Sequence, residues 1–79
     1  MIDLDTLLDR RHTADALTAA GFPITASTLA TKATRGGGPP YTLFGRRPLY
    51  KWADALSWAQ SRLSPPAATS SEHHAREAA

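Results

Sequence analysis

Three breaks divide this sequence into short segments, and they limit its fold more than any other feature. Residues 36–40 read GGGPP and favour neither helix nor strand, because glycine loses the most backbone entropy on ordering and proline lacks an N–H group. Gly21-Phe22-Pro23 and Ser64-Pro65-Pro66 each suit the end of a helix. No strand pattern precedes residues 36–40 and no Gly-Lys-Ser/Thr follows, so we interpret them as a flexible connector rather than a phosphate-binding loop.

The segment before the first break predicts a helix over about residues 10–20. Asp9 is a candidate N-cap, Leu8 before it suits a hydrophobic staple, and Gly21 fits the position after the helix C-terminus. The expected inward side chains are Ala14, Leu17 and Ala20.

The first turn of this helix carries two cations, Arg10 and Arg11, at the end where the helix dipole disfavours positive charge. Contact with a phosphate would explain them, and two solvated arginines are the alternative. His12 is interpreted as a surface or capping histidine.

Residues 25–35 predict a short helix with two unlike faces. Thr25 is a good N-cap and Gly36 ends the helix. One face has apolar residues at helical spacing, namely Ala26, Leu29, Ala30 and Ala33. The opposite face and its flanks carry hydroxyls and cations without an acid: Ser27, Thr28, Thr31, Lys32 and Arg35. Such a face suits a DNA major groove, and an ordinary surface helix is the alternative.

Residues 41–50 have a strand-like pattern at both ends and a turn at Gly45-Arg46. A two-residue loop with glycine first is the signature of a type II′ hairpin. Proline is tolerated where the facing pair has no ladder hydrogen bond to lose. The predicted pairs are Phe44 with Arg47, hydrogen-bonded, and Leu43 with Pro48, not hydrogen-bonded.

A last helix is predicted over residues 51–63. Trp58 lies off its inward stripe and is expected to pack against the hairpin or the N-terminal segment. Both tryptophans are interpreted as core residues, because so small a domain needs large apolar groups. The inward stripe is Trp52, Ala55, Leu56, Ala59 and Leu63.

The two ends of the chain differ in composition. Residues 1–8 are too apolar for a free tail and suit either a helical turn or an extended lead-in packed on the body. Residues 64–79 are small and polar and lack aromatics, so they are expected to form a disordered tail. The 79 residues thus predict one small domain over residues 1–63.

Charge is concentrated in the body of the chain. The whole chain has a net charge of only +2, but residues 10–62 hold eight bases against two acids, a net of +6. A basic body favours a polyanionic partner, nucleic acid first. Arg46 and Arg47, at the tip of the predicted hairpin, would reach phosphates or a minor groove, with a solubilising turn as the alternative.

The predicted elements follow the order of a winged helix-turn-helix: helix, turn, short polar-faced helix, two-stranded wing and closing helix. This fold is mainly α with a two-stranded β-hairpin. Residues 7–63 resemble the small excisionase and prophage-regulator proteins, whose fold is similar to the DNA-binding domain of the MerR regulators. The resembling motifs are Leu7-Leu8-Asp9 with Ala14 and Leu17, Ile24-Thr25-Ala26-Ser27-Thr28-Leu29, Pro40-Tyr41, Gly45-Arg46-Arg47, and Asp54 with Trp58.

The resemblance implies DNA binding with residues 25–35 as recognition helix and the hairpin as wing. It further implies an accessory role in site-specific recombination, as a recombination directionality factor that binds DNA cooperatively beside a recombinase, or transcriptional control on a mobile element. Departures from the family are a longer first helix, a recognition helix poor in long side chains, and a glycine run that loosens the link to the wing.

Other functions fit the sequence less well. With no cysteine, no paired carboxylates on one face and no convincing metal cluster, we expect neither an enzyme nor a cofactor or metal site. A protein-interaction module of the same fold is the rival from another class, and the recognition domain of a phage packaging subunit is a third alternative. No apolar run approaches membrane-spanning length, so a cytoplasmic protein is expected.

Overall fold

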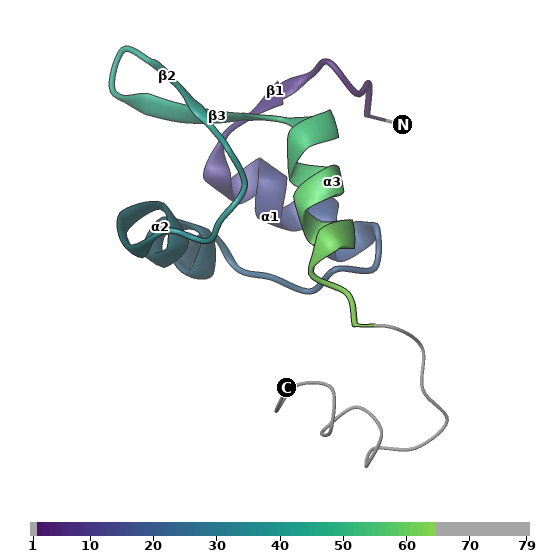
Figure 1. The fold of residues 1–79 in the computed structure, drawn as a ribbon. Coiled ribbons are helices and arrows are strands. Elements are labelled where there is room, and N and C mark those ends of the chain that lie inside the picture. Colours follow the sequence, from purple (N-terminus) through teal and green to yellow (C-terminus); the bar gives the residue numbers. More distant parts are fainter. Residues whose placement is uncertain (1, 65–79) are drawn as a thin grey trace.

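The computed structural model describes residues 2–64, which form three helices and one three-stranded antiparallel sheet (Figure 1). The elements are β1 (Leu7–Leu8), α1 (Arg10–Ala19), α2 (Ala26–Arg35), β2 (Thr42–Phe44), β3 (Arg47–Lys51) and α3 (Trp52–Ser61). The sheet runs along the top of the view in Figure 1, and α1 lies below it between α2 and α3. The predicted disordered tail falls, apart from Ser64, outside the described residues. No helix within residues 2–64 is long and apolar enough to cross a membrane.

The prediction of a two-stranded sheet is wrong by one strand, because residues 1–8 contribute β1. The strand order is β1-β3-β2, with Leu7 opposite Lys51 and Leu8 opposite Tyr50. This segment is extended at Leu7–Leu8, one of the two conformations considered for it, and forms a turn over residues 3–6. It also supplies carbonyl groups to the N-terminus of α3, whose N-cap Lys51 makes no side-chain cap bond. The backbone N–H of Trp52 donates to Thr6 O at 2.9 Å, and that of Ala53 donates to Leu4 O at 2.9 Å. These bonds satisfy two of the N–H groups that a helix leaves unpaired at its start.

The hairpin has the predicted register. Phe44 faces Arg47 and Leu43 faces Pro48. Gly45 has φ +66°, and no other residue type has a positive φ in the described chain, so Arg46 cannot occupy the second position of a type I′ turn. This combination agrees with the predicted type II′ turn, in which only the first central residue needs a positive φ.

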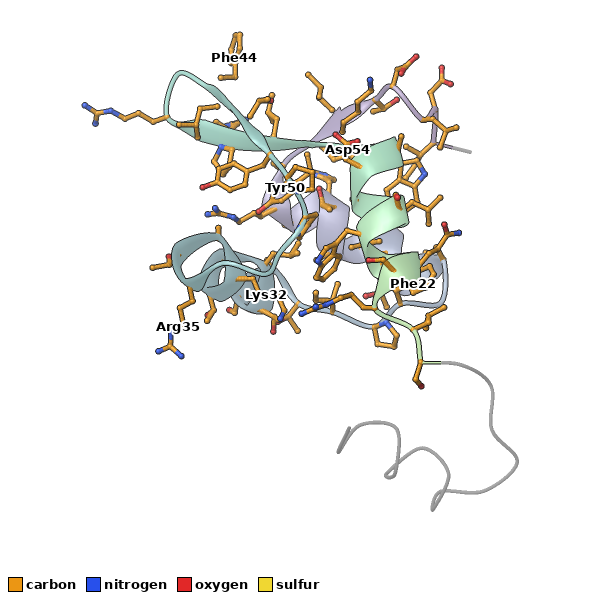
Figure 2. The ribbon with its side chains drawn as sticks, viewed as in Figure 1. Phe22, Lys32, Arg35, Phe44, Tyr50 and Asp54 are labelled. Atoms are coloured by element: carbon orange, nitrogen blue, oxygen red, sulfur yellow. The ribbon has the colours of Figure 1, made fainter. Side chains whose placement is uncertain are left out.

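One face of the sheet packs onto the helices, and Tyr50 is its centre. The Tyr50 side chain is almost fully buried and points from β3 toward the helices (Figure 2). Leu8 and Pro48 are half-buried on the same face by strand alternation, whereas Leu7 and Phe44 lie on the outer face and are exposed.

The core below the sheet joins α1, α2 and α3. Its central cluster is Leu17, Trp52, Ala55 and Ala59, and Leu29 of α2 is buried as well. Two expected inward residues are exposed instead. Ala20 is the C-cap of α1, and Leu63 lies past the end of α3 with 65% of its surface exposed, so neither continues the helical stripe.

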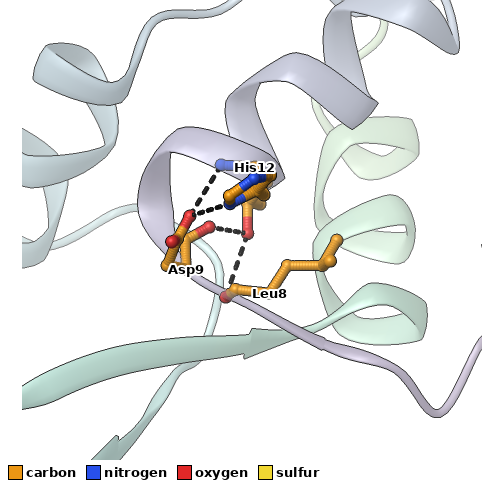
Figure 3. A network of polar contacts seen from close by, with 4 residues as sticks. Leu8, Asp9 and His12 are labelled. Carbon is orange, nitrogen blue, oxygen red and sulfur yellow. Dashed lines mark hydrogen bonds and ion pairs between the residues drawn. The ribbon is translucent and has the colours of Figure 1, made fainter.

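Both ends of α1 have the predicted caps. The Asp9 side chain accepts from the His12 N–H at 2.8 Å, and the Thr13 hydroxyl donates to Asp9 O at 2.6 Å (Figure 3). At the other end Gly21, with φ +101°, donates to Thr18 O, and Phe22 N–H donates to Leu17 O. These two bonds form a Schellman motif, which turns the chain sharply toward α2.

The connector after α2 is anchored, contrary to the expectation of a flexible link. Trp58 Nε1 donates to Gly37 O at 2.9 Å, so Trp58 packs on this loop rather than on the hairpin or the N-terminal segment. Pro39 is buried, and a Cβ added to Gly38 would lie 2.9 Å from Lys32 Cβ. A side chain at position 38 would therefore force the loop away from α2.

Candidate nucleic-acid interface

The candidate interface starts from the exposed face of α2. Thr25 caps the helix as predicted, because its hydroxyl accepts from the Thr28 N–H at 3.2 Å. Leu29 is fully buried, which orients the helix so that the opposite side faces solvent. The exposed residues on that side and its flank include four of the five predicted contacts: Ser27, Thr28, Thr31 and Arg35.

The threonine hydroxyls on this face already have local partners. Thr31 Oγ1 donates to Ser27 O at 3.1 Å, and Thr28 Oγ1 lies 3.0 Å from Thr25 Oγ1. Thr31 therefore presents its methyl group and an acceptor oxygen to a ligand, rather than a free hydroxyl hydrogen. A thymine methyl is the base-edge group that such a surface suits best.

The two cations of α2 differ in their surroundings, which corrects the expectation that they share one exposed side. Lys32 is half-buried and its stem lies against Gly38 of the connector. Arg35 is exposed at the last position of α2 and extends away from the body in Figure 2. Arg35 is therefore the long cation of α2 with unhindered reach, and its place in the last turn is also favourable to the helix dipole.

The hairpin tip holds the second pair of predicted contacts. Arg46 and Arg47 are both exposed, in the turn and at the start of β3.

Arg47 also acts on the N-terminal cap of α1, because its charge contributes to lowering the pKa of Asp9. The larger causes of the lowered Asp9 pKa are the hydrogen bonds from the His12 backbone N–H and from its ring, whose Nδ1 lies 2.8 Å from Asp9 Oδ1. His12 is thus the capping histidine that the sequence suggested.

Arg10 is held by two tyrosines, so it is not the freely solvated side chain that was one alternative for it. It is half-buried, its Nε donates to Tyr50 Oη at 3.0 Å, and its guanidinium carbon lies 5.5 Å from the centre of the Tyr41 ring. The Tyr41 and Tyr50 rings are in turn 5.5 Å apart. These contacts tie the start of α1 to β3 and to the residue before β2, and they offset the unfavourable helix dipole. Arg11, the next residue, is exposed.

Sequence reasoning missed this tyrosine cluster because its members are 31 to 40 positions from Arg10 and no local motif joins them. The sequence did hold one indication that Tyr50 faces the helices, because alternation along residues 47–51 puts Pro48 and Tyr50 on one face of the strand.

α2 and the hairpin tip project to the same side of the molecule, away from α3 (Figure 1). The ribbons of α2 and of the arginine turn therefore lie on one side of the molecule, and Arg35 at the end of α2 points away from the hairpin in Figure 2. The guanidinium carbon of Arg62 lies 5.9 Å from the centre of the Trp58 ring, and Arg62 Nη2 would lie 3.8 Å from a Cβ added to Gly37, so Arg62 reaches back to the connector. Comparison of the chain with protein-family models, with curated proteins and with solved structures found no match.

Proposed function

We propose that this domain binds duplex DNA as a winged helix-turn-helix, with α2 as recognition helix and the β2–β3 hairpin as wing. The observation that carries the proposal is that α2, whose hydroxyl-bearing residues are exposed, lies on the same side of the molecule as the exposed arginine tip. An α-helix with side chains is about 10–12 Å across, and the major groove of B-DNA is about 12 Å wide. α2 is also short enough, at 10 residues, to lie within one stretch of groove.

The hairpin would provide orientation more than sequence selection. Arg46 and Arg47 are long cations on a tight turn, and contacts from such groups to phosphates position a protein without distinguishing bases. Arg35, Thr28 and Thr31 would face base edges, where Arg can bond guanine and Thr can contact a thymine methyl. Because the threonine hydroxyls are partly engaged, shape readout would contribute alongside direct contacts.

The cellular role that we propose is that of an excisionase, an accessory factor that binds DNA cooperatively and directs a site-specific recombinase. This finer proposal depends on the motif resemblance of residues 7–63. A single short recognition helix also offers less interface than tight specific sites normally use, which favours several copies on repeated sites. A small transcriptional regulator and a protein-interaction module remain the competing functions. A recombinase gene beside this one would favour excision over regulation.

The test of DNA binding is the salt dependence of affinity for a duplex of about 20 base pairs. Contact with about 4–6 phosphates predicts that log K falls with log salt at a slope of roughly −4 to −5. Arg46→Ala should reduce the magnitude of this slope by about one. Lys51→Ala is the matched control, because Lys51 lies at the far end of β3 and pairs with Asp5 at 3.4 Å, so its loss should leave the slope unchanged. A slope near zero for the unmodified protein would exclude DNA binding of this kind.

A further inference from the structure

The hairpin tip leaves two large apolar side chains in solvent, which the proposed phosphate contacts do not explain. Phe44 is 77% exposed and Leu43 is 64% exposed. Figure 2 shows Phe44 extending from the hairpin away from the rest of the molecule. Scattered apolar residues are normal on surfaces, but a phenylalanine next to the turn of a projecting hairpin is placed where a partner would meet it first.

We propose that Phe44 is an apolar wedge that enters the minor groove with the arginine tip, inserts at a base step and bends the duplex. The proposal rests on the DNA binding proposed above. Apolar side chains of this kind partly unstack a base step and kink DNA toward the major groove. A wedge would give the hairpin a second role, since it would favour sites whose steps unstack easily, such as pyrimidine–purine steps.

The charges around Phe44 favour DNA over a protein as the partner. Arg47 faces Phe44 across the hairpin, and Arg46 lies in the adjoining turn. Residues 41–50 contain no acid. An apolar group bordered by two cations, on a hairpin that itself carries no acid, suits a polyanion with an apolar interior. Duplex DNA has this character, because its stacked bases lie between two phosphate backbones.

The backbone of the tip suits insertion as well. The two strands are joined by a two-residue turn with Gly45 at φ +66°, so the tip is only two strands wide. Paired strands lie about 4.8 Å apart and the minor groove of B-DNA is about 6 Å wide. The minor groove must widen to admit the two strands of the hairpin. The kink that follows insertion of an apolar wedge widens the groove.

The experiment uses duplexes that carry 2-aminopurine at successive steps, together with end-labelled duplexes whose energy transfer reports bending. The unmodified protein should raise 2-aminopurine fluorescence at one step and shorten the end-to-end distance. Phe44→Ala should abolish both signals and weaken affinity about tenfold, while leaving the salt slope unchanged. Phe44→Leu should retain most of the bend. Leu7→Ala is the matched control, because Leu7 is exposed on the same outer face of the sheet but lies far from the tip.

Four results would overturn the proposal, and they are distinguishable. Binding without bending or unstacking, or full signals with Phe44→Ala, would exclude the wedge and leave DNA binding intact. A Phe44→Ala variant that loses only self-association, measured by sedimentation of the free protein, would assign the side chain to a protein contact. Absence of any duplex binding by the unmodified protein would exclude both the wedge and the proposed function.

Discussion

The position of the candidate recognition helix depends on one side chain, and its removal gives a quantitative test of the fold. Among the ten residues of α2, Leu29 alone is fully buried. Leu29→Ala should remove the one fully buried side chain of α2, the helix that packs against α1. Leucine-to-alanine changes at buried sites cost about 2–5 kcal/mol of stability. We expect about 3 kcal/mol here, because neighbouring side chains such as Ala26 and Ala30 are too small to fill the cavity that the substitution leaves.

That loss is large relative to the stability of so small a domain. At about 0.05–0.15 kcal/mol per residue, a domain of this size has roughly 3–9 kcal/mol in total. The midpoint of thermal unfolding should therefore fall by about 10–25 °C. Urea unfolding followed by the fluorescence of Trp52 and Trp58, with helix content followed in parallel, measures the change directly. Thr31→Ala is the control on the same helix, because Thr31 is exposed and its replacement should change stability by less than about 0.5 kcal/mol. A loss below about 1 kcal/mol for Leu29→Ala would refute the described packing of α2.

Further predictions concern three single positions, namely Arg35, Asp9 and Gly45. Arg35→Ala should weaken binding to the true DNA site more than to random DNA, by about 1–3 kcal/mol if its contact is bidentate, whereas Arg46→Ala should weaken both nearly equally in the same titrations. Asp9→Ala should cost about 1 kcal/mol by removing a helix cap. Folding lowers the pKa of Asp9, so the stability that its carboxylate contributes is present above the unfolded pKa of about 3.9 and is lost as the pH falls through the folded pKa. The acid unfolding of Asp9→Asn should therefore be less steep below about pH 4. Gly45→Ala should lower stability by about 1 kcal/mol, since φ is +66° there while no atom within 4 Å would meet the new Cβ, and an unchanged melting temperature would contradict the described turn.

Features governed by short-range chemistry were predictable from the sequence. The caps at Asp9, Thr25 and Gly21 each depend on residues within five positions, and so does the hairpin register set by Gly45. In each case a side-chain oxygen, or the freedom of glycine to adopt a positive φ, decides the local backbone before any tertiary contact forms.

Features governed by distant contacts were not predictable. β1 forms because Leu7 and Leu8 pair with the free edge of β3. The two residues alone do not predict this pairing. The connector is held by Trp58, whose indole N–H reaches Gly37 from 21 positions away. The candidate interface shows the same division. Its exposed threonines follow from the helical period. The hydrogen bond of Arg10 depends on a distant tyrosine, and the half-burial of Lys32 depends on the connector that lies against it.

The central claim, that α2 and the hairpin tip form a DNA-binding surface, is tested most directly by mapping amide chemical shifts on adding a short duplex. We expect the perturbed amides to cluster at Thr28, Thr31 and Arg35 and at residues 44–47, while those around Arg62 at the end of α3 change little. Perturbation centred on α3, or no perturbation at low salt, would show that α2 and the hairpin tip do not form a DNA-binding surface.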